Sequence, residues 1–181
     1  MKKISLAPFF PLLIAIFVSC ERPDYDEEIN EIYAEAERLS SSGTVIDGNM
    51  WSARSKERMT FEDAVSYCYH IDELGYNDWR LPTIDQLRTL ITDCPETETG
   101  GSCGLTDACL LKTTEEDCDD SDCSCGWRDS YYDDESSYSK LGDWGELWSS
   151  IPNEIGGWYV NFSNGSIQEY YVAHFWVRCV R

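Results

Sequence analysis

The sequence predicts an α+β domain that carries a disulfide-rich insertion, and three observations indicate this class. Two segments have helix N-cap signals followed by apolar residues at helical spacing, and the end of the chain alternates apolar and polar residues as strands do. Six cysteines lie in the polar stretch between these parts. About 160 residues follow a leader segment, which is enough for a single domain with a real core.

An opening hairpin and a first helix begin the domain near residue 43. Two short apolar runs, 45–46 and 50–51, flank an Asp47-Gly48 turn. Thr60 is a natural N-cap, and Asp63 three residues later is placed to reach back as in a capping box. Gly75 is expected to end this helix. Its apolar stripe consists of Phe61, Ala64, Val65, Cys68, Ile71 and Leu74.

A second helix follows the Pro82-Thr83 step. Thr83 is the N-cap, and Gln86 stands three residues later in another capping-box pattern. Because a proline disfavours helical backbone at the residue before it, the helix cannot begin earlier. The face that we expect to be buried consists of Ile84, Leu87 and Ile91.

The apolar periodicity is lost between residues 94 and 139, which form the insertion. Such a polar stretch cannot bury enough apolar surface to order itself, so we expect disulfides to order it. Six cysteines allow 15 connectivities, and the sequence does not choose among them. These cysteines are Cys94, Cys103, Cys109, Cys118, Cys123 and Cys125.

The end of the chain returns to strand patterns. Residues 158–163 alternate, Asn164-Gly165 is typical of a two-residue hairpin turn, and residues 166–171 are expected to form the returning strand. In the last strand, residues 175, 177 and 179 share one face and residues 176, 178 and 180 the other. Cys179 then faces the core, as Cys68 does from the first helix.

The leader resembles a bacterial export signal that ends at a lipidation site. Residues 1–19 combine a basic start with a short apolar run, and the Phe17-Val18-Ser19-Cys20 string resembles a lipobox. If Cys20 forms a thioether to the lipid, eight cysteines remain. An even number is typical of proteins whose cysteines all pair as disulfides in an oxidising compartment. The alternative is an ordinary signal peptide with Cys20 in a disulfide. Residues 20–42 are expected to be a lipid-anchored acidic tether, with a short amphipathic helix or fully disordered.

Charge excludes some classes of partner. The formal net charge is −20, and loss of Lys2 and Lys3 with the signal would make it about −22. Nucleic acids and anionic lipids both require a basic face, so we expect neither as a partner. The expected membrane contact is therefore the lipid anchor alone.

Several strings resemble the C-terminal domain family of the Legionella collagen-like adhesin, also met as the Fibrobacter major paralogous domain. These are the early Met50-Trp51 strand, a helix with alanine and cysteine, the stretch from 75 to 83 that contains Trp-Arg-Leu-Pro-Thr, and the closing Val-Arg-Cys-Val-Arg at 177–181. The match covers about 43–181. The resemblance implies a C-type-lectin-like fold with two helices beside a looped antiparallel sheet, a disulfide between Cys68 and Cys179, and a secreted or surface location. The insertion is longer than the loops common in the family.

The insertion contains two candidate metal sites. The alternating acids could bind calcium loosely, although they lack the EF-hand glycine and glutamate; the alternative is a solvated acidic loop. These acids are Asp117, Asp119, Asp120 and Asp122. Zinc on Cys118, Cys123 and Cys125 is disfavoured because exported thiols oxidise and no histidine lies nearby.

Aromatic side chains offer a second kind of site. Trp127, Tyr131 and Tyr132 lie in polar surroundings, so we expect them to be exposed and to contact a ligand. Trp144 and Trp148 are expected in the core.

We therefore expect a binding domain at the bacterial cell surface, lipid-anchored in the envelope at the outer membrane or cell surface. The insertion would recognise a glycan, a matrix polymer or a protein. The alternative is a structural or assembly component of the envelope without a discrete ligand. An enzyme is not expected, because no hydrolase, metalloprotease or phosphate-loop motif occurs. Clustered titratable groups in a deep cleft near His70 or His174 would favour an enzyme.

Overall fold

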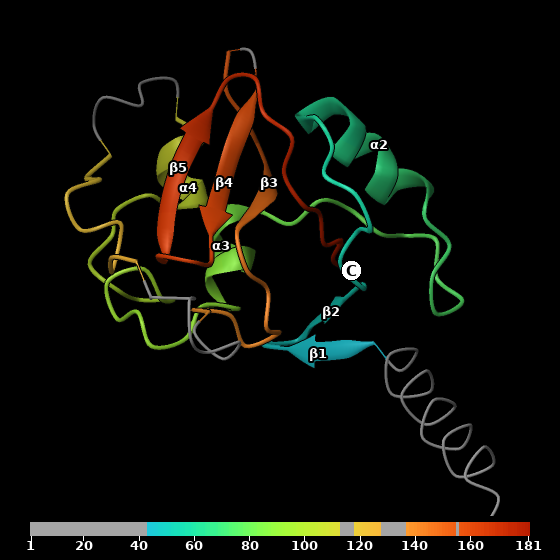
Figure 1. Cartoon of the computed structure of the whole chain (residues 1–181), viewed down its shortest axis with the longest axis horizontal. Coiled ribbons are helices and arrows are strands. Elements are labelled where there is room, and N and C mark those ends of the chain that lie inside the picture. The colour runs from blue at the N-terminus through green and yellow to red at the C-terminus, as the bar shows by residue number, and fades with distance from the viewer. Residues whose placement is uncertain (1–42, 113–117, 128–136, 155) are drawn as a thin grey trace, which may run out of the picture. The chain divides into compact units, whose positions relative to one another are not determined.

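The computed structural model (Figure 1) describes residues 43–112, 118–127, 137–154 and 156–181. Helices and a three-stranded antiparallel sheet share one domain, which confirms the α+β class. The predicted signal, Cys20 and tether lie outside these ranges. In the parts described, no helix has the length and apolar character needed to cross a membrane.

The opening hairpin pairs β1 (Thr44–Ile46) with β2 (Asn49–Trp51), as predicted. Asp47 and Gly48 have φ of 47° and 79°, the left-handed backbone that a tight two-residue hairpin turn requires. Met50 exchanges both backbone hydrogen bonds with Arg181, at 2.9 and 3.0 Å. The first and last segments of the domain therefore lie side by side, with the C-terminus beside β2 in Figure 1.

Helix α2 (Phe61–His70) begins at the predicted cap, since Thr60 accepts a hydrogen bond from the Asp63 amide. It ends earlier than predicted, because Ile71 already has extended backbone and a tight turn centred on Leu74 and Gly75 follows. Val65, expected on the buried stripe, is 45% exposed. Each residue turns a helix by about 100°, so a stripe centred on positions 64 and 68 leaves Val65 at its margin.

Helix α3 (Ile84–Arg88) has the complete capping box predicted for Thr83 and Gln86. The predicted inward face is confirmed: Ile84 and Leu87 have no exposed surface, and Ile91 is 1% exposed.

The main sheet has the order β3-β4-β5, from β3 (Glu146–Pro152), β4 (Gly157–Asn161) and β5 (Ser166–Tyr170). Strand β3 was not predicted. The turn between β4 and β5 spans four residues, because Asn161 pairs with Ser166, and the two-residue turn is therefore wrong. Within this turn, the Phe162 amide donates to the Gly145 carbonyl, and the Phe162 side chain is fully buried.

The closing segment, 175–181, is a series of short bridges and not the predicted continuous strand. Phe175 pairs with Met59, Trp176 with Leu147, and Val180 with both Trp51 and Arg80. Each neighbouring segment pairs with only one or two residues of 175–181, so no long β-ladder forms among the described residues. The face expected to be opposite the core contains Val180, which is fully buried.

Two apolar clusters form the core. The larger lies among α3, the sheet and the insertion, and the smaller lies between α2 and the sheet. The Cys68–Cys179 disulfide, with a Cα–Cα distance of 5.4 Å, lies within the smaller cluster and joins α2 to the closing segment. This is the pairing that the family resemblance implies.

Candidate functional site

Three disulfides hold the insertion together. They join Cys94 to Cys125, Cys103 to Cys123, and Cys109 to Cys118. These sulfurs are bonded to one another, so they are not available as zinc thiolates. The helix α4 (Asp107–Leu110), which the sequence did not reveal, lies within the same stretch.

A buried arginine anchors the insertion to α3. Arg88 is 3% exposed and donates to four backbone carbonyls at 2.9–3.4 Å. Burial lowers the pKa of its guanidinium, and the nearby charges of Asp85 and Asp107 oppose that shift. The four carbonyls belong to Thr97, Glu98, Cys103 and Leu105.

Sequence reasoning missed Arg88, although a signal was present. The residue lies four positions after Ile84 and therefore shares its buried helical face. A cationic residue on the apolar face of a helix, shortly before a long loop whose backbone carbonyls need donors, is a pattern that could have identified Arg88.

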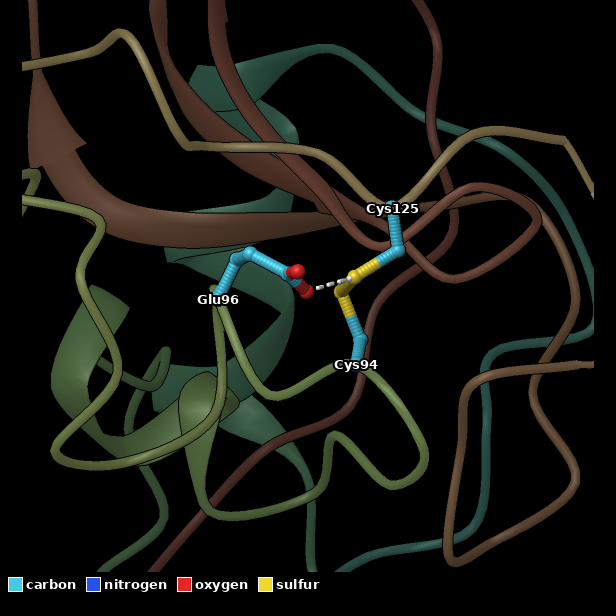
Figure 2. A group of neighbouring side chains, drawn as sticks. All are labelled: Cys94, Glu96 and Cys125. Carbon is cyan, nitrogen blue, oxygen red and sulfur yellow. Dashed lines mark hydrogen bonds between the residues drawn. A yellow bond between two sulfur atoms is a disulfide. The ribbon is translucent and has the colours of Figure 1, made fainter.

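Glu96 contacts the Cys94–Cys125 disulfide, as Figure 2 shows. Its Oε2 lies 2.7 Å from Sγ of Cys125, and the three potential ligand atoms lie within 4.8 Å of one another. Because the two sulfurs form a disulfide, they offer no thiolate to a metal ion. The cluster is therefore a structural contact between a carboxyl group and a disulfide.

The insertion is attached along the outer edge of β5. The Cys125 amide donates to the Asn164 carbonyl at 3.0 Å, and the Ile167 amide donates to the Cys123 carbonyl at 3.3 Å. A Cβ on Gly165 would lie 2.6 Å from Sγ of Cys94, so only glycine allows this close approach at the turn.

A groove of about 570 Å³ opens beyond this attachment, between the insertion and β5. We call it the β5 groove. The sequence pointed to the insertion as the recognition surface but not to the strand that forms the opposite wall. The lining residues are Leu105, Asp120, Ser121, Cys123, Ser124, Trp158, Tyr159, Ile167, Gln168, Glu169 and Tyr170.

The β5 groove is acidic. Asp120 and Glu169 line it, and among the described residues of its lining none is a lysine, arginine or histidine. The Glu169 carboxylate accepts hydrogen bonds from the Asn153 amide group at 3.0 Å and the Tyr171 hydroxyl at 3.3 Å, both neutral donors. Next to the groove, hydrogen bonds from the Ser121 hydroxyl and amide lower the pKa of Asp119.

The three predicted calcium ligands that the structure describes do not converge. Asp119, Asp120 and Asp122 are exposed, and within the described residues they form no group of three with closely spaced ligand atoms. Asp119 accepts from Ser121 at 2.7 Å instead. Asp117 lies outside the described residues, and calcium binding by this loop stays a prediction.

The aromatic predictions have mixed outcomes. Trp127 is 72% exposed, as expected, whereas Tyr131 and Tyr132 lie outside the described residues. Trp148 is 1% exposed and confirms its predicted burial. Trp144 is 49% exposed, so its predicted burial is wrong: it precedes β3, whereas Trp148 lies on the face of β3 that packs on α2.

A second hollow, of about 560 Å³, lies beside α2. His70 and His174 both line it and both are exposed. The His70 Nδ1 lies 2.7 Å from the Ser66 carbonyl oxygen, within its own helix. Among the described residues, neither histidine belongs to a three-residue group with metal-ligand spacing.

Fold and site define a small α+β domain, closed by disulfides, with an acidic groove between an insertion and an edge strand. The model of the Lcl C-terminal domain matches residues 43–181, and the chain belongs to this family. Comparisons with curated proteins and with solved structures gave no match. Family membership suggests an adhesin-like role at the bacterial cell surface.

Proposed function

We propose that this chain is a lipid-anchored bacterial surface protein whose domain, 43–181, binds an external ligand in the β5 groove. In this proposal residues 1–19 direct export, Cys20 carries the lipid, and residues 20–42 hold the domain away from the membrane. The ligand is a glycan, a matrix polymer or a protein, and the protein is anchored at the outer membrane or cell surface. The domain binds and does not catalyse.

The observation that carries the proposal is the β5 groove on a rigid frame. Its volume of about 570 Å³ falls within the roughly 300–1,000 Å³ of small-ligand sites. One wall belongs to a sheet, and the other is held by the Cys103–Cys123 disulfide. A wall fixed in this way loses little conformational entropy when a ligand binds.

A C-type-lectin-like fold is the finer part of the proposal. The two longer helices beside an antiparallel sheet, the adjacent first and last segments, and the Cys68–Cys179 bridge all support it. In such folds the variable loops contact ligands. The insertion, as one wall of the β5 groove, would take that place.

The test is binding of the full chain, in mild detergent, to glycan and protein arrays with calcium present or chelated. Tyr170→Ala removes a half-exposed ring from the groove, and Tyr69→Ala removes an exposed ring from α2 as the matched control. We expect a ligand that the Tyr69→Ala protein retains and the Tyr170→Ala protein loses. A ligand that both variants retain equally would place recognition outside the groove.

One observation favours the alternative of an assembly component without a discrete ligand. Three consecutive residues at the end of β5 and directly after it expose apolar surface: Tyr170 is 50% exposed, Tyr171 49% and Val172 78%. An exposed apolar run of this kind is typical of a protein interface. Failure to bind either array would favour this alternative.

A further inference from the structure

We propose that the β5 groove binds an extended peptide segment rich in lysine or arginine, which adds as a strand to the outer edge of β5. The inference rests on the proposed function and names its ligand class. Three features carry it: the hydrogen-bonding groups at the edge, the shape of the groove and its charge.

Some backbone groups at the outer edge of β5 have no partner within the part of the chain that the structure describes. The Ile167 amide donates to the Cys123 carbonyl, so it points away from β4. Because backbone groups alternate along a strand, those of Glu169 point to the same outer edge. Neither the amide nor the carbonyl of Glu169 has a backbone partner there among the described residues.

The insertion begins the pairing and then leaves it. Cys125 forms a backbone hydrogen bond with Asn164, and Cys123 forms one with Ile167. The insertion segment 123–125 therefore runs antiparallel to β5. Towards Asp119 it is held elsewhere, because the Gly104 amide donates to the Asp119 carbonyl at 2.8 Å. The groove opens where the two segments separate, beside Glu169. A peptide there would continue the ladder that Cys123 ends.

The charge of the groove selects a basic occupant. Asp120 and Glu169 line it, no cationic side chain lies among its described lining residues, and the chain has a formal net charge of −20. Such a field attracts basic segments and speeds their encounter. An acidic peptide would leave both carboxylates facing like charges.

Trp158, which lies in the groove lining, has a buried indole donor with no partner in the described ranges. Trp158 is 7% exposed, and its indole Nε1–H has no hydrogen-bond acceptor among the described residues. The Nε1 atom is itself buried away from the groove surface, so this donor is not part of the proposed contact. The half-exposed Tyr170 ring adds contact area for an aliphatic or basic side chain.

The test uses the full chain in mild detergent and fluorescein-labelled seven-residue peptides, followed by fluorescence anisotropy. The probe alternates lysine with threonine and valine. One control peptide replaces each lysine by glutamate, and a second carries N-methyl groups on alternate amides, which removes the donors of one peptide edge. We expect binding of the lysine peptide, weaker at high salt, and loss of binding with both controls.

Variants at one position separate charge from backbone pairing. Glu169→Gln removes a charge-assisted contact and should weaken binding roughly tenfold. Glu169→Pro also removes the outward N–H, which β4 does not use, and should weaken binding roughly fivefold more. Glu62→Gln, an exposed acid on α2, is the control and should leave binding unchanged. Thermal unfolding verifies that each variant folds. The N-methylated peptide tests backbone pairing on the unchanged protein, independently of any variant.

The outcomes distinguish this inference from the proposed function. If the lysine and glutamate peptides bind equally, or N-methylation changes nothing, strand addition of a basic segment is wrong. If a glycan binds and Tyr170→Ala abolishes its binding while no peptide binds, the groove is a site but its ligand class is wrong. If neither arrays nor peptides bind, both proposals fail.

Discussion

Removal of the Cys68–Cys179 disulfide should destabilise the domain far more than removal of the Cys109–Cys118 disulfide. The first pair lies 111 residues apart in the sequence and the second only 9. In the chain-entropy model a disulfide stabilises by restricting the unfolded chain, and the effect grows with the logarithm of the loop length. The two bridges therefore provide a matched pair of perturbations in one protein.

The magnitudes follow from these separations. The long loop corresponds to about 4–5 kcal/mol at 25 °C and the short loop to about 2.5 kcal/mol. The other bridges shorten the effective long loop by only a few tens of residues, which the logarithm makes a small correction. Cys68 and Cys179 have no exposed surface, so replacing both by alanine also loses packing. The expected difference of about 2 kcal/mol is therefore a minimum.

The assay is equilibrium unfolding in urea, followed by tryptophan fluorescence, of the paired Cys→Ala variants and the unchanged chain. With a slope of about 2 kcal/mol per M, the two variants should differ in midpoint by roughly 1 M. Calorimetry at the same pH gives an independent order of stability. Equal losses, or a larger loss for the Cys109–Cys118 variant, would refute the assignment of the long bridge as the principal covalent restraint.

Three further predictions concern buried polar groups. Arg88→Met leaves four carbonyls without their donor and should cost roughly 2–4 kcal/mol in urea unfolding, with faster proteolysis of the insertion. Asp143→Asn removes the charge that accepts from Arg178 Nε at 2.6 Å and should cost roughly 3 kcal/mol, whereas no change would show that the ion pair adds nothing. Burial, with smaller contributions from nearby acids, raises the pKa of Tyr159 to about 12. The unfolded chain then loses this proton first, so stability should fall between about pH 10 and about 12, and Tyr159→Phe should remove that fall and one late absorbance titration.

The local signals in the sequence predicted local structure well. Thr60 and Thr83 start α2 and α3 because a side-chain cap needs only residues three positions away. The turn at Asp47-Gly48 forms because short extended segments flank it on both sides and because glycine tolerates positive φ. The end of α2 was mispredicted because the chain leaves the helix to form the Glu73–Tyr76 turn, which the apolar pattern alone does not show.

The candidate site was only partly predictable. The sequence pointed to the insertion and to the exposure of Trp127, both from composition. The opposite wall of the β5 groove comes from Gln168, Glu169 and Tyr170, which lie more than forty residues after the groove-lining segment 120–124 and in an ordinary strand pattern. No local feature indicates that this strand is an edge or that the insertion separates from it beside Glu169.

The sequence by itself determined the two principal helix starts, the opening hairpin, the acidic charge and membership of a family whose pattern implies the Cys68–Cys179 bridge. These properties depend on neighbouring residues or on composition. The tertiary structure alone decided the pairing of the six insertion cysteines, the burial of Arg88 among four carbonyls, and the groove beside β5. Each of these depends on which distant segments share the core, and chain entropy makes many such arrangements possible until packing selects one.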